Sequence, residues 1–259
     1  EPLLSLCAER RAQMSFLDLV GLSKRFPVND GEVVALDGVD LSVSEGEAVV
    51  VLGPSGCGKS TLLQIVAGLD PPSAGQVLLD GKPVADWSAE RTLIFQKPNL
   101  FPWLTALENV AFGLRMAGMS KSDRLETAGE ALDRMGLSGA AGLYPHELSG
   151  GMQQRVALAR ALVLAPAVLL MDEPLASVDA LLRSRLQGEI RRACAGRTVL
   201  FVTHSIREAL ILADRLVILS PRPGRVRHEL KLDGTAPRVY TPDLALLERQ
   251  IEEDLLESG

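Results

Sequence analysis

The segment GPSGCGKST at residues 53–61 constrains this chain more than any other part of the sequence. It follows the apolar run 47–52, which is typical of a buried strand, and it leads into residues 59–67, where Leu62, Leu63 and Val66 recur at helical spacing. Glycines in such a loop let successive backbone N–H groups point at a phosphate, and the helix adds the positive end of its dipole. This strand, loop and helix with the pattern GxxxxGK[ST] predict a nucleotide site.

Within the loop, Lys59 is expected to reach the terminal phosphates and Ser60 to place its hydroxyl on Mg²⁺. The Cys57 thiol is close to a helix N-terminus and to Lys59, both of which favour the thiolate, so we expect maleimide to inactivate the protein and MgATP to protect it. The predicted loop contacts to the nucleotide are Gly53, Pro54, Ser55, Gly56, Cys57, Gly58, Lys59, Ser60 and Thr61.

Two carboxylates end a second apolar run, VLLMDE at residues 168–173. The carboxyl ends of parallel strands meet at one edge of a sheet, where α/β folds bind ligands. Asp172 is predicted to hold Mg²⁺ through its water shell, and Glu173 to accept a proton from the water that attacks the γ-phosphate.

The rest of the chain alternates strands and helices, which predicts the α/β class with a mostly parallel sheet. Residues 16–26 and 33–43 are predicted strands around a turn at 29–31, and further strands are expected at 76–79, 92–95, 168–171, 198–202 and 216–219. We expect one domain over residues 15–240, followed by a C-terminal amphipathic helix within 241–259. The domain should contain a helical insert over about 97–157, in which a helix starts near Ser120.

Residues 1–14 are expected to be disordered, with Met14 as the natural start; a native but weakly ordered extension is the alternative.

Charge and cysteine content exclude several classes. The longest uncharged run is about a dozen residues, whereas a membrane-spanning helix needs roughly twenty apolar ones, so we do not expect the chain to cross a bilayer. The formal charge of −6 argues against a general nucleic-acid binder. Cys7, Cys57 and Cys194 are too few and too widely spaced for a disulfide framework or a zinc site, and a reducing cytoplasm fits them best.

The segment LSGGMQQR at residues 148–155 resembles the signature of ATP-binding cassette (ABC) ATPases, and the resemblance extends over about residues 16–225. Ser149, Gly150 and Gly151 also open a predicted helix, which is a second anion-binding arrangement. The resemblance implies a P-loop NTPase of the ABC type, with an N-terminal antiparallel β subdomain, a helical insert, and ATP and Mg²⁺ as ligands. It also implies a head-to-tail homodimer, in which each ATP lies between the phosphate loop of one copy and the signature of the other.

Further residues take roles from the resemblance, by matching position. Gln96 resembles the residue that touches Mg²⁺ and the attacking water, and His204 resembles the switch histidine that contacts the γ-phosphate. Asp179 matches the loop that links the two active sites, and Phe26 is the candidate for stacking on adenine, with core packing as its alternative. The implied sets are Glu173, His204, Gln96 and Lys59 for catalysis, Ser60, Gln96 and Asp172 for the metal, and Ser149, Gly150, Gly151 and Gln153 for the ATP of the partner. Lys97 stands where the family often has glutamate.

The motifs at 98–105, 144–151 and 219–225 are similar to the ATPases of nitrate, sulfonate and taurine uptake systems. This similarity implies the ATP-hydrolysing subunit of a bacterial importer, peripheral on the cytoplasmic face of the inner membrane. Its partners would be a second copy, a separate permease and, indirectly, a periplasmic solute-binding protein, with no nucleic acid. The alternative is a soluble ABC-type ATPase acting on nucleic acid or ribosomes, which salt-sensitive nucleic-acid binding would support.

An apolar segment at residues 100–104, four residues beyond Gln96, is the predicted permease contact. It contains Leu100, Phe101, Trp103 and Leu104, interrupted by a proline that disfavours a regular helix. The alternative is that these side chains close the core of the helical insert.

Overall fold

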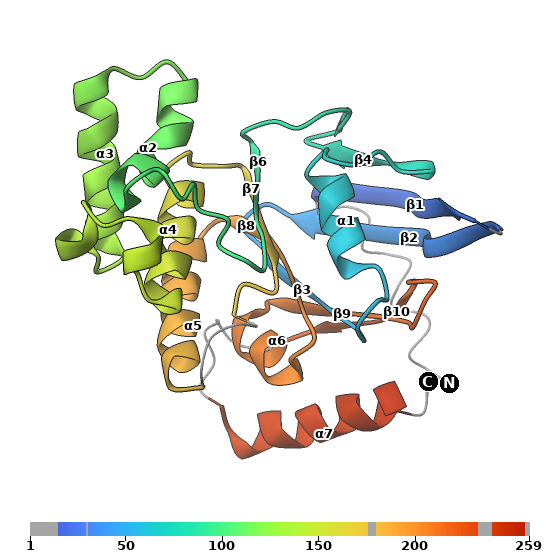
Figure 1. Cartoon of the computed structure of the whole chain (residues 1–259). Helices are drawn as coiled ribbons and strands as arrows, with labels where there is room; N and C mark the ends of the chain where they lie inside the picture. The colour runs from blue at the N-terminus through green and yellow to red at the C-terminus, as the bar shows by residue number, and fades with distance from the viewer. Residues whose placement is uncertain (1–14, 30, 176–179, 233–239, 257–259) are drawn as a thin grey trace.

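A six-stranded sheet forms the centre of the computed structural model, which describes residues 15–29, 31–175, 180–232 and 240–256 (Figure 1). Its strand order is β10-β9-β3-β8-β7-β6. Strands β9, β3, β8, β7 and β6 are parallel, whereas β10 pairs antiparallel with β9 at one edge. The strands are β3 (Ala48–Leu52), β6 (Arg91–Ile94), β7 (Val168–Asp172), β8 (Thr198–Thr203), β9 (Arg215–Leu219) and β10 (Val226–Lys231).

The parallel strands are covered on both faces, which explains why they appear as continuous apolar runs in the sequence. In β8, Leu200 and Val202 belong to the core on one face, whereas Val199 and Phe201 belong to the core on the other. Because successive side chains of a strand point to opposite faces, both sets must be apolar. The carboxyl ends of these strands are thereby held at one rigid edge of the sheet.

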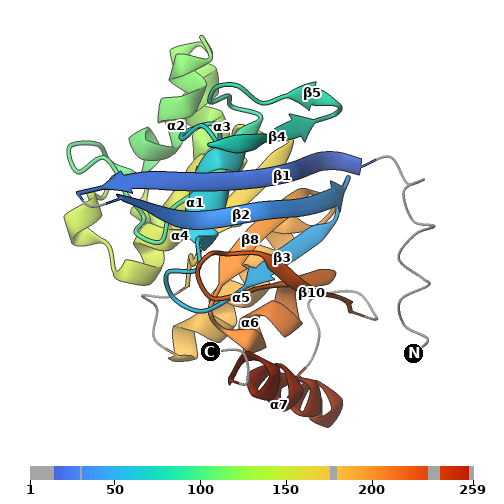
Figure 2. The ribbon, with the colours of Figure 1, turned by 90° about the vertical axis from the view of Figure 1, so that its right-hand side faces the viewer.

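A second, antiparallel sheet has the order β2-β1-β4-β5 and stacks over one face of the first (Figure 2). Its strands are β1 (Ser15–Val28), β2 (Gly31–Ser44), β4 (Ala74–Leu79) and β5 (Lys82–Pro83). Helix α1 (Lys59–Val66) lies between the two sheets, and its Leu62 and Leu63 are fully buried in the shared core. This packing fixes the loop that precedes α1.

The helices beyond β6 form a lobe with a core of its own. They are α2 (Ala106–Met116), α3 (Lys121–Arg134), the 3₁₀ turns η1 (Ser138–Ala140) and η2 (Pro145–Glu147), and α4 (Gly150–Leu162). Val110, Leu132 and Val156 from α2, α3 and α4 are fully buried together. Ser120 caps α3 by accepting the N–H of Asp123 at 3.3 Å.

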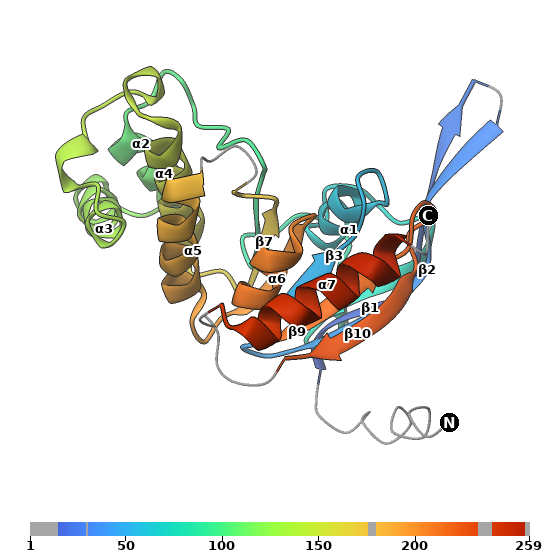
Figure 3. The same cartoon turned by 90° about the horizontal axis from the view of Figure 1, so that it is seen from below.

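Three more helices cover the remaining face of the parallel sheet: α5 (Ala180–Cys194), α6 (Ile206–Leu212) and α7 (Pro242–Leu256). Figure 3 shows α7 lying across α6 and the β9 edge of the sheet. Leu244, Leu247 and Ile251 of α7 pack into the core on that face. Among the described residues, no helix is both long and apolar enough to span a membrane.

The structure confirms the α/β class, the mostly parallel sheet, the N-terminal antiparallel sheet and the helix that starts near Ser120. The predicted strand at 76–79 is also present, as β4 of the antiparallel sheet, and two strands, β5 and β10, are additional. Strand β10 is an edge strand with mostly exposed polar side chains, so it lacks the apolar run by which the parallel strands are recognised. The expectation for residues 1–14 lies outside the described part of the chain.

Candidate active site

The predicted phosphate loop lies between β3 and α1, and its glycines are required by its shape. Gly56 and Gly58 have φ of 78° and 103°, in the region that other residues rarely adopt. A Cβ on Gly58 would also lie 2.7 Å from a methyl of Leu36 and 2.8 Å from the carbonyl oxygen of Ala35. Strand β2 therefore packs directly against the loop and leaves no room for a side chain there.

Lys59, the first residue of α1, folds back over the loop. Its Nζ donates to the carbonyl oxygens of Gly53 at 2.7 Å and Pro54 at 3.0 Å, and it lies 3.9 Å from Oε1 of Glu173. The side chain is only 6% exposed. The ammonium is thus held between the loop and the end of β7, where a bound phosphate would meet it.

Ser60 and Asp172 provide oxygens of the kind that Mg²⁺ prefers. The Ser60 hydroxyl donates to Oδ1 of Asp172 at 3.1 Å, so the two oxygens already converge. Burial raises the pKa of Asp172, and the nearby charge of Glu173 raises it further, against the hydrogen bond from Ser60 and the charge of Lys59. A divalent cation would relieve this cost, so the chemistry of the pair fits Mg²⁺.

Glu173 follows β7 in a strained conformation, with φ of 42°. Its N–H donates to the carbonyl oxygen of Val202 in β8 at 3.0 Å. Its Oε2 lies 2.9 Å from Nδ1 of His204, which directly follows β8 and is 57% exposed. The ends of two adjacent parallel strands therefore bring a carboxylate and an imidazole together beside Lys59.

Lys59, Ser60, Asp172 and Glu173 line one cleft of about 380 Å³, whereas His204 contacts Glu173 but does not itself line the cleft. Phe26 lies at its edge, 37% exposed, with Nζ of Lys24 5.2 Å from its ring centroid. Gln96, just beyond β6, contributes an exposed side chain. Arg222 also lines the cleft, which no pattern in the sequence predicted. The lining residues are Phe26, Val33, Ala35, Ser55, Gly56, Gly58, Lys59, Ser60, Thr61, Gln96, Asp172, Glu173 and Arg222.

The LSGG segment does not line this cleft; it lies on the helical lobe, at the start of α4. Ser149 caps α4 by accepting the N–H of Met152 at 3.3 Å, and Ser149 and Gly150 are exposed. Gln153 is placed differently: its Nε2 donates to the carbonyl oxygens of Pro145 at 2.8 Å and Leu148 at 3.2 Å. Its amide group therefore braces the turn before α4. Asp179 lies outside the described residues.

Cys57 does not have the environment expected from the sequence. Its side chain is 1% exposed and belongs to the core between the two sheets. Burial raises the pKa of its thiol and outweighs the charge of Lys59. The prediction of a reactive thiolate is therefore wrong, because the loop turns this side chain into the core and Cys57 does not line the cleft.

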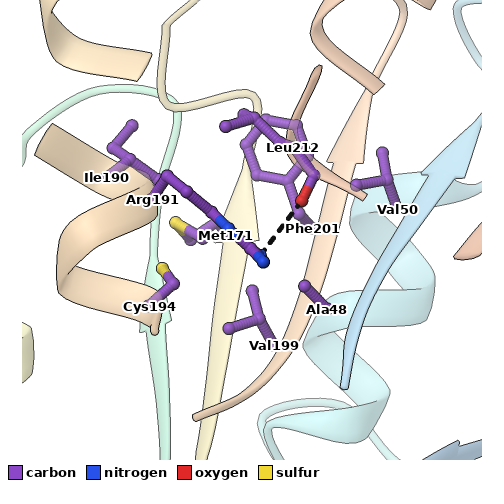
Figure 4. A pocket seen from close by; sticks show the side chains of 9 residues that line it. All are labelled: Ala48, Val50, Met171, Ile190, Arg191, Cys194, Val199, Phe201 and Leu212. Carbon is purple, nitrogen blue, oxygen red and sulfur yellow. Dashed lines mark hydrogen bonds between the residues drawn. The ribbon is translucent and has the colours of Figure 1, made fainter. Parts of the chain in front are cut away.

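A small cavity of about 10 Å³ lies on the other face of the sheet, beneath α5 (Figure 4). Arg191 crosses its edge and donates to the carbonyl oxygen of Leu212 at 3.3 Å. The cavity has room for no more than one water molecule, so it is a packing gap. Its lining residues are Ala48, Val50, Met171, Ile190, Arg191, Cys194, Val199, Phe201 and Leu212.

The fold and the cleft together define a P-loop nucleotide-binding domain. A family model described as "ABC transporter" matches residues 36–176. The chain belongs to this family of ABC transporter ATP-binding subunits, and it is an ATPase.

Individual relatives agree with this assignment. The chain is 51% identical over 205 residues to the taurine import ATP-binding protein TauB of Burkholderia pseudomallei, covering 77% of this chain and 78% of the relative. It is 49% identical over 227 residues to the uncharacterized ABC transporter ATP-binding protein MJ0412 of Methanocaldococcus jannaschii, covering 87% and 85%. A solved structure of the ATP-binding cassette MJ0796, a dimer in a post-hydrolysis state bound to ADP and Pi, superposes with a TM-score of 0.76 at 35% identity, covering 85% of this chain and 100% of that one.

Proposed function

We propose that this chain is the ATP-hydrolysing subunit of an importer for a small anion such as nitrate, a sulfonate or taurine, acting through a separate permease. Identity of 46% to 51% to proteins named taurine import ATP-binding proteins supports the importer assignment. In this proposal the chain binds peripherally to the cytoplasmic face of the membrane, and a periplasmic solute-binding protein delivers the solute to the permease.

The observation that carries the catalytic part is the convergence of Lys59, Glu173 and His204 beside the phosphate loop. Lys59 and the loop N–H groups would bind the phosphates. Ser60, Asp172 and Gln96 would hold Mg²⁺, which neutralises phosphate charge when bound. Glu173 would accept the proton of the attacking water, and His204 would orient Glu173 and contact the γ-phosphate.

A head-to-tail pair of chains completes the site in this proposal. The exposed N-terminus of α4, with Ser149 and Gly150, presents an anion-binding end that the cleft of its own copy does not use. The relative MJ0796 is described as dimeric. We place the ATP between the phosphate loop of one copy and the LSGG segment of the other.

A large apolar cleft of about 560 Å³ supports the permease contact. It lies between β6, α2 and α4, and Phe95 and Pro98 on either side of Gln96 both line it. Two of its lining residues are well exposed, Trp87 at 58% and Met116 at 66%, so apolar side chains are accessible there to a partner. A partner segment with apolar anchors would fill it, and movement there would reach the active site through Gln96.

The predicted 100–104 patch divides between two environments. Phe101 is half-buried against Phe112, with ring centroids 4.6 Å apart, and Asn109 binds its backbone N–H at 2.8 Å. Trp103 is 70% exposed. Trp103 is therefore the better probe of docking, because replacing Phe101 would also disturb the helical lobe.

The test is uptake by liposomes containing the tagged chain, its co-purified permease and the solute-binding protein, with taurine, an alkylsulfonate and nitrate as solutes. Trp103→Ala with Met116→Asp should leave the ATPase rate and Tm of the isolated chain nearly unchanged but abolish assembly and uptake. Leu246→Asp, on the exposed side of α7 at 59% exposure, is the matched control and should transport normally. Uptake by the double variant equal to that of the control would contradict the docking site, and a large fall in Tm would assign the patch to the core of the lobe.

A further inference from the structure

The segment SPRPGR at residues 220–225 connects β9 to β10 and forms a closed loop. The N–H of Ser220 donates to the carbonyl oxygen of Arg225 at 2.9 Å, and the Ser220 hydroxyl donates to that of Pro223 at 2.7 Å. The same hydroxyl accepts the N–H of Arg225 at 3.0 Å. These bonds connect the two ends of the loop and stabilise its shape.

Gly224 seats this loop directly on the phosphate loop. Its N–H donates to the carbonyl oxygen of Ala35 in β2 at 2.9 Å, and its own carbonyl oxygen accepts the N–H of Asp37 at 3.1 Å. A Cβ on Gly224 would lie 2.2 Å from the carbonyl oxygen of Cys57. Only glycine allows the two loops to approach this closely.

Arg222 projects from the loop onto the cleft side of this contact. Its Nε donates to the carbonyl oxygen of Gly56 at 3.1 Å. The other end of the same peptide group, the N–H of Cys57, donates to the carbonyl oxygen of Pro54 at 3.3 Å. The peptide between Gly56 and Cys57 is therefore held from both sides, in the part of the loop where Gly56 has its left-handed conformation.

The guanidinium charge of Arg222 is not neutralised by a carboxylate in the part of the chain that the structure describes. Lys24, Arg215 and Arg225 each form an ion pair with a carboxylate, whereas Arg222 has no such partner among the described residues. An arginine that lines a nucleotide cleft without a carboxylate leaves its positive charge available to a polyphosphate.

From this arrangement we infer that Arg222 is a positioning residue of the phosphate loop, which raises affinity for the nucleotide polyphosphate and leaves the chemical step to other groups. The hydrogen bond keeps the Gly56 carbonyl turned toward Arg222, so that the loop presents its N–H groups to phosphate without rearrangement. The charge adds long-range attraction for the same ligand. This inference rests on the cleft being the ATP site.

The test compares Arg222→Ala and Arg222→Lys with Arg227→Ala, which removes an exposed arginine of β10 that does not line the cleft. Kd for MgATP and MgADP, KM, kcat and Tm are measured on the full chain. Arg222→Ala should raise Kd and KM about tenfold, with kcat within about twofold of wild type. Arg222→Lys should recover part of the affinity because it keeps the charge, and Arg227→Ala should match wild type. Gly224→Ala keeps the arginine but pushes its loop away from the phosphate loop, so it should weaken binding as well.

A pure structural role would lower Tm and kcat together without the selective rise in KM, and that result would overturn the inference. Unchanged Kd in Arg222→Ala would overturn it too. Either outcome requires a wild type that binds and hydrolyses ATP, whereas a wild-type chain that binds no nucleotide would contradict the proposed function itself.

Discussion

Nδ1 of His204 lies 2.9 Å from Oε2 of Glu173, and this contact joins the ends of two neighbouring parallel strands. The backbone of Glu173 is strained, and it is held by the hydrogen bond from its N–H to Val202, in the same strand that leads to His204. The carboxylate is therefore positioned by β8 as much as by β7, which carries it. Strain of this kind is retained where geometry matters for function.

His204→Ala should lower ATP turnover about a hundredfold, because Glu173 loses the group that orients it. His204→Gln, which can still hydrogen-bond to the carboxylate, should retain more activity. The measurement is steady-state phosphate release at saturating MgATP. His228→Ala, which removes an exposed histidine of β10, serves as control. Equal rates in His204→Ala and the control would show that hydrolysis does not depend on the contact between His204 and Glu173.

Asp172→Asn should raise the free energy of unfolding of the protein when nucleotide and Mg²⁺ are absent. The same variant should lose Mg²⁺-dependent hydrolysis. Burial raises the pKa of Asp172, so the folded chain binds this proton more tightly than the unfolded chain does. The free energy of unfolding therefore falls as pH rises through the raised pKa, and asparagine does not incur this loss. Thermal unfolding should give the variant the higher Tm at pH 7 to 8, with a difference that shrinks toward acidic pH. A Tm below that of wild type at neutral pH would contradict the account.

Cys57 should resist N-ethylmaleimide in the folded protein, because its thiol is buried and its pKa is raised. Cys194 should resist as well, since burial raises its pKa to about 12. In a Cys7→Ser background, mass spectrometry should find no adduct on the native protein and full ATPase activity, while both remaining thiols react in urea. Rapid labelling of Cys57 with loss of activity would restore the expectation drawn from sequence.

Features determined by neighbouring residues could be predicted from the sequence. The phosphate loop and the acidic end of β7 could be recognised because each combines a buried strand with a fixed local pattern. The start of α3 can be recognised in the same way from Ser120 and Asp123. The start of α2 has a similar signal, because Thr105 and Glu108 form a capping box at its N-terminus.

Features that depend on contacts between distant segments could not be predicted. Whether Cys57 faces the cleft or the core is determined by the packing of the loop against β2 and β9, and the motif does not encode it. The position of Arg222 depends on a loop more than 160 residues away from Gly56 along the chain. Gln153 matches a position of the ABC signature, yet its amide binds backbone carbonyls of the preceding turn.

The central claim is that Glu173 accepts the proton of the attacking water in a site formed by two copies of the chain. The most direct measurement is gel filtration of Glu173→Gln with MgATP or MgADP, together with its rate of phosphate release. Turnover should fall about 10²- to 10⁴-fold, and a dimer should appear with MgATP and not with MgADP, because ATP is bound but not consumed. Near-normal hydrolysis, or a chain that binds ATP and stays monomeric, would contradict the account.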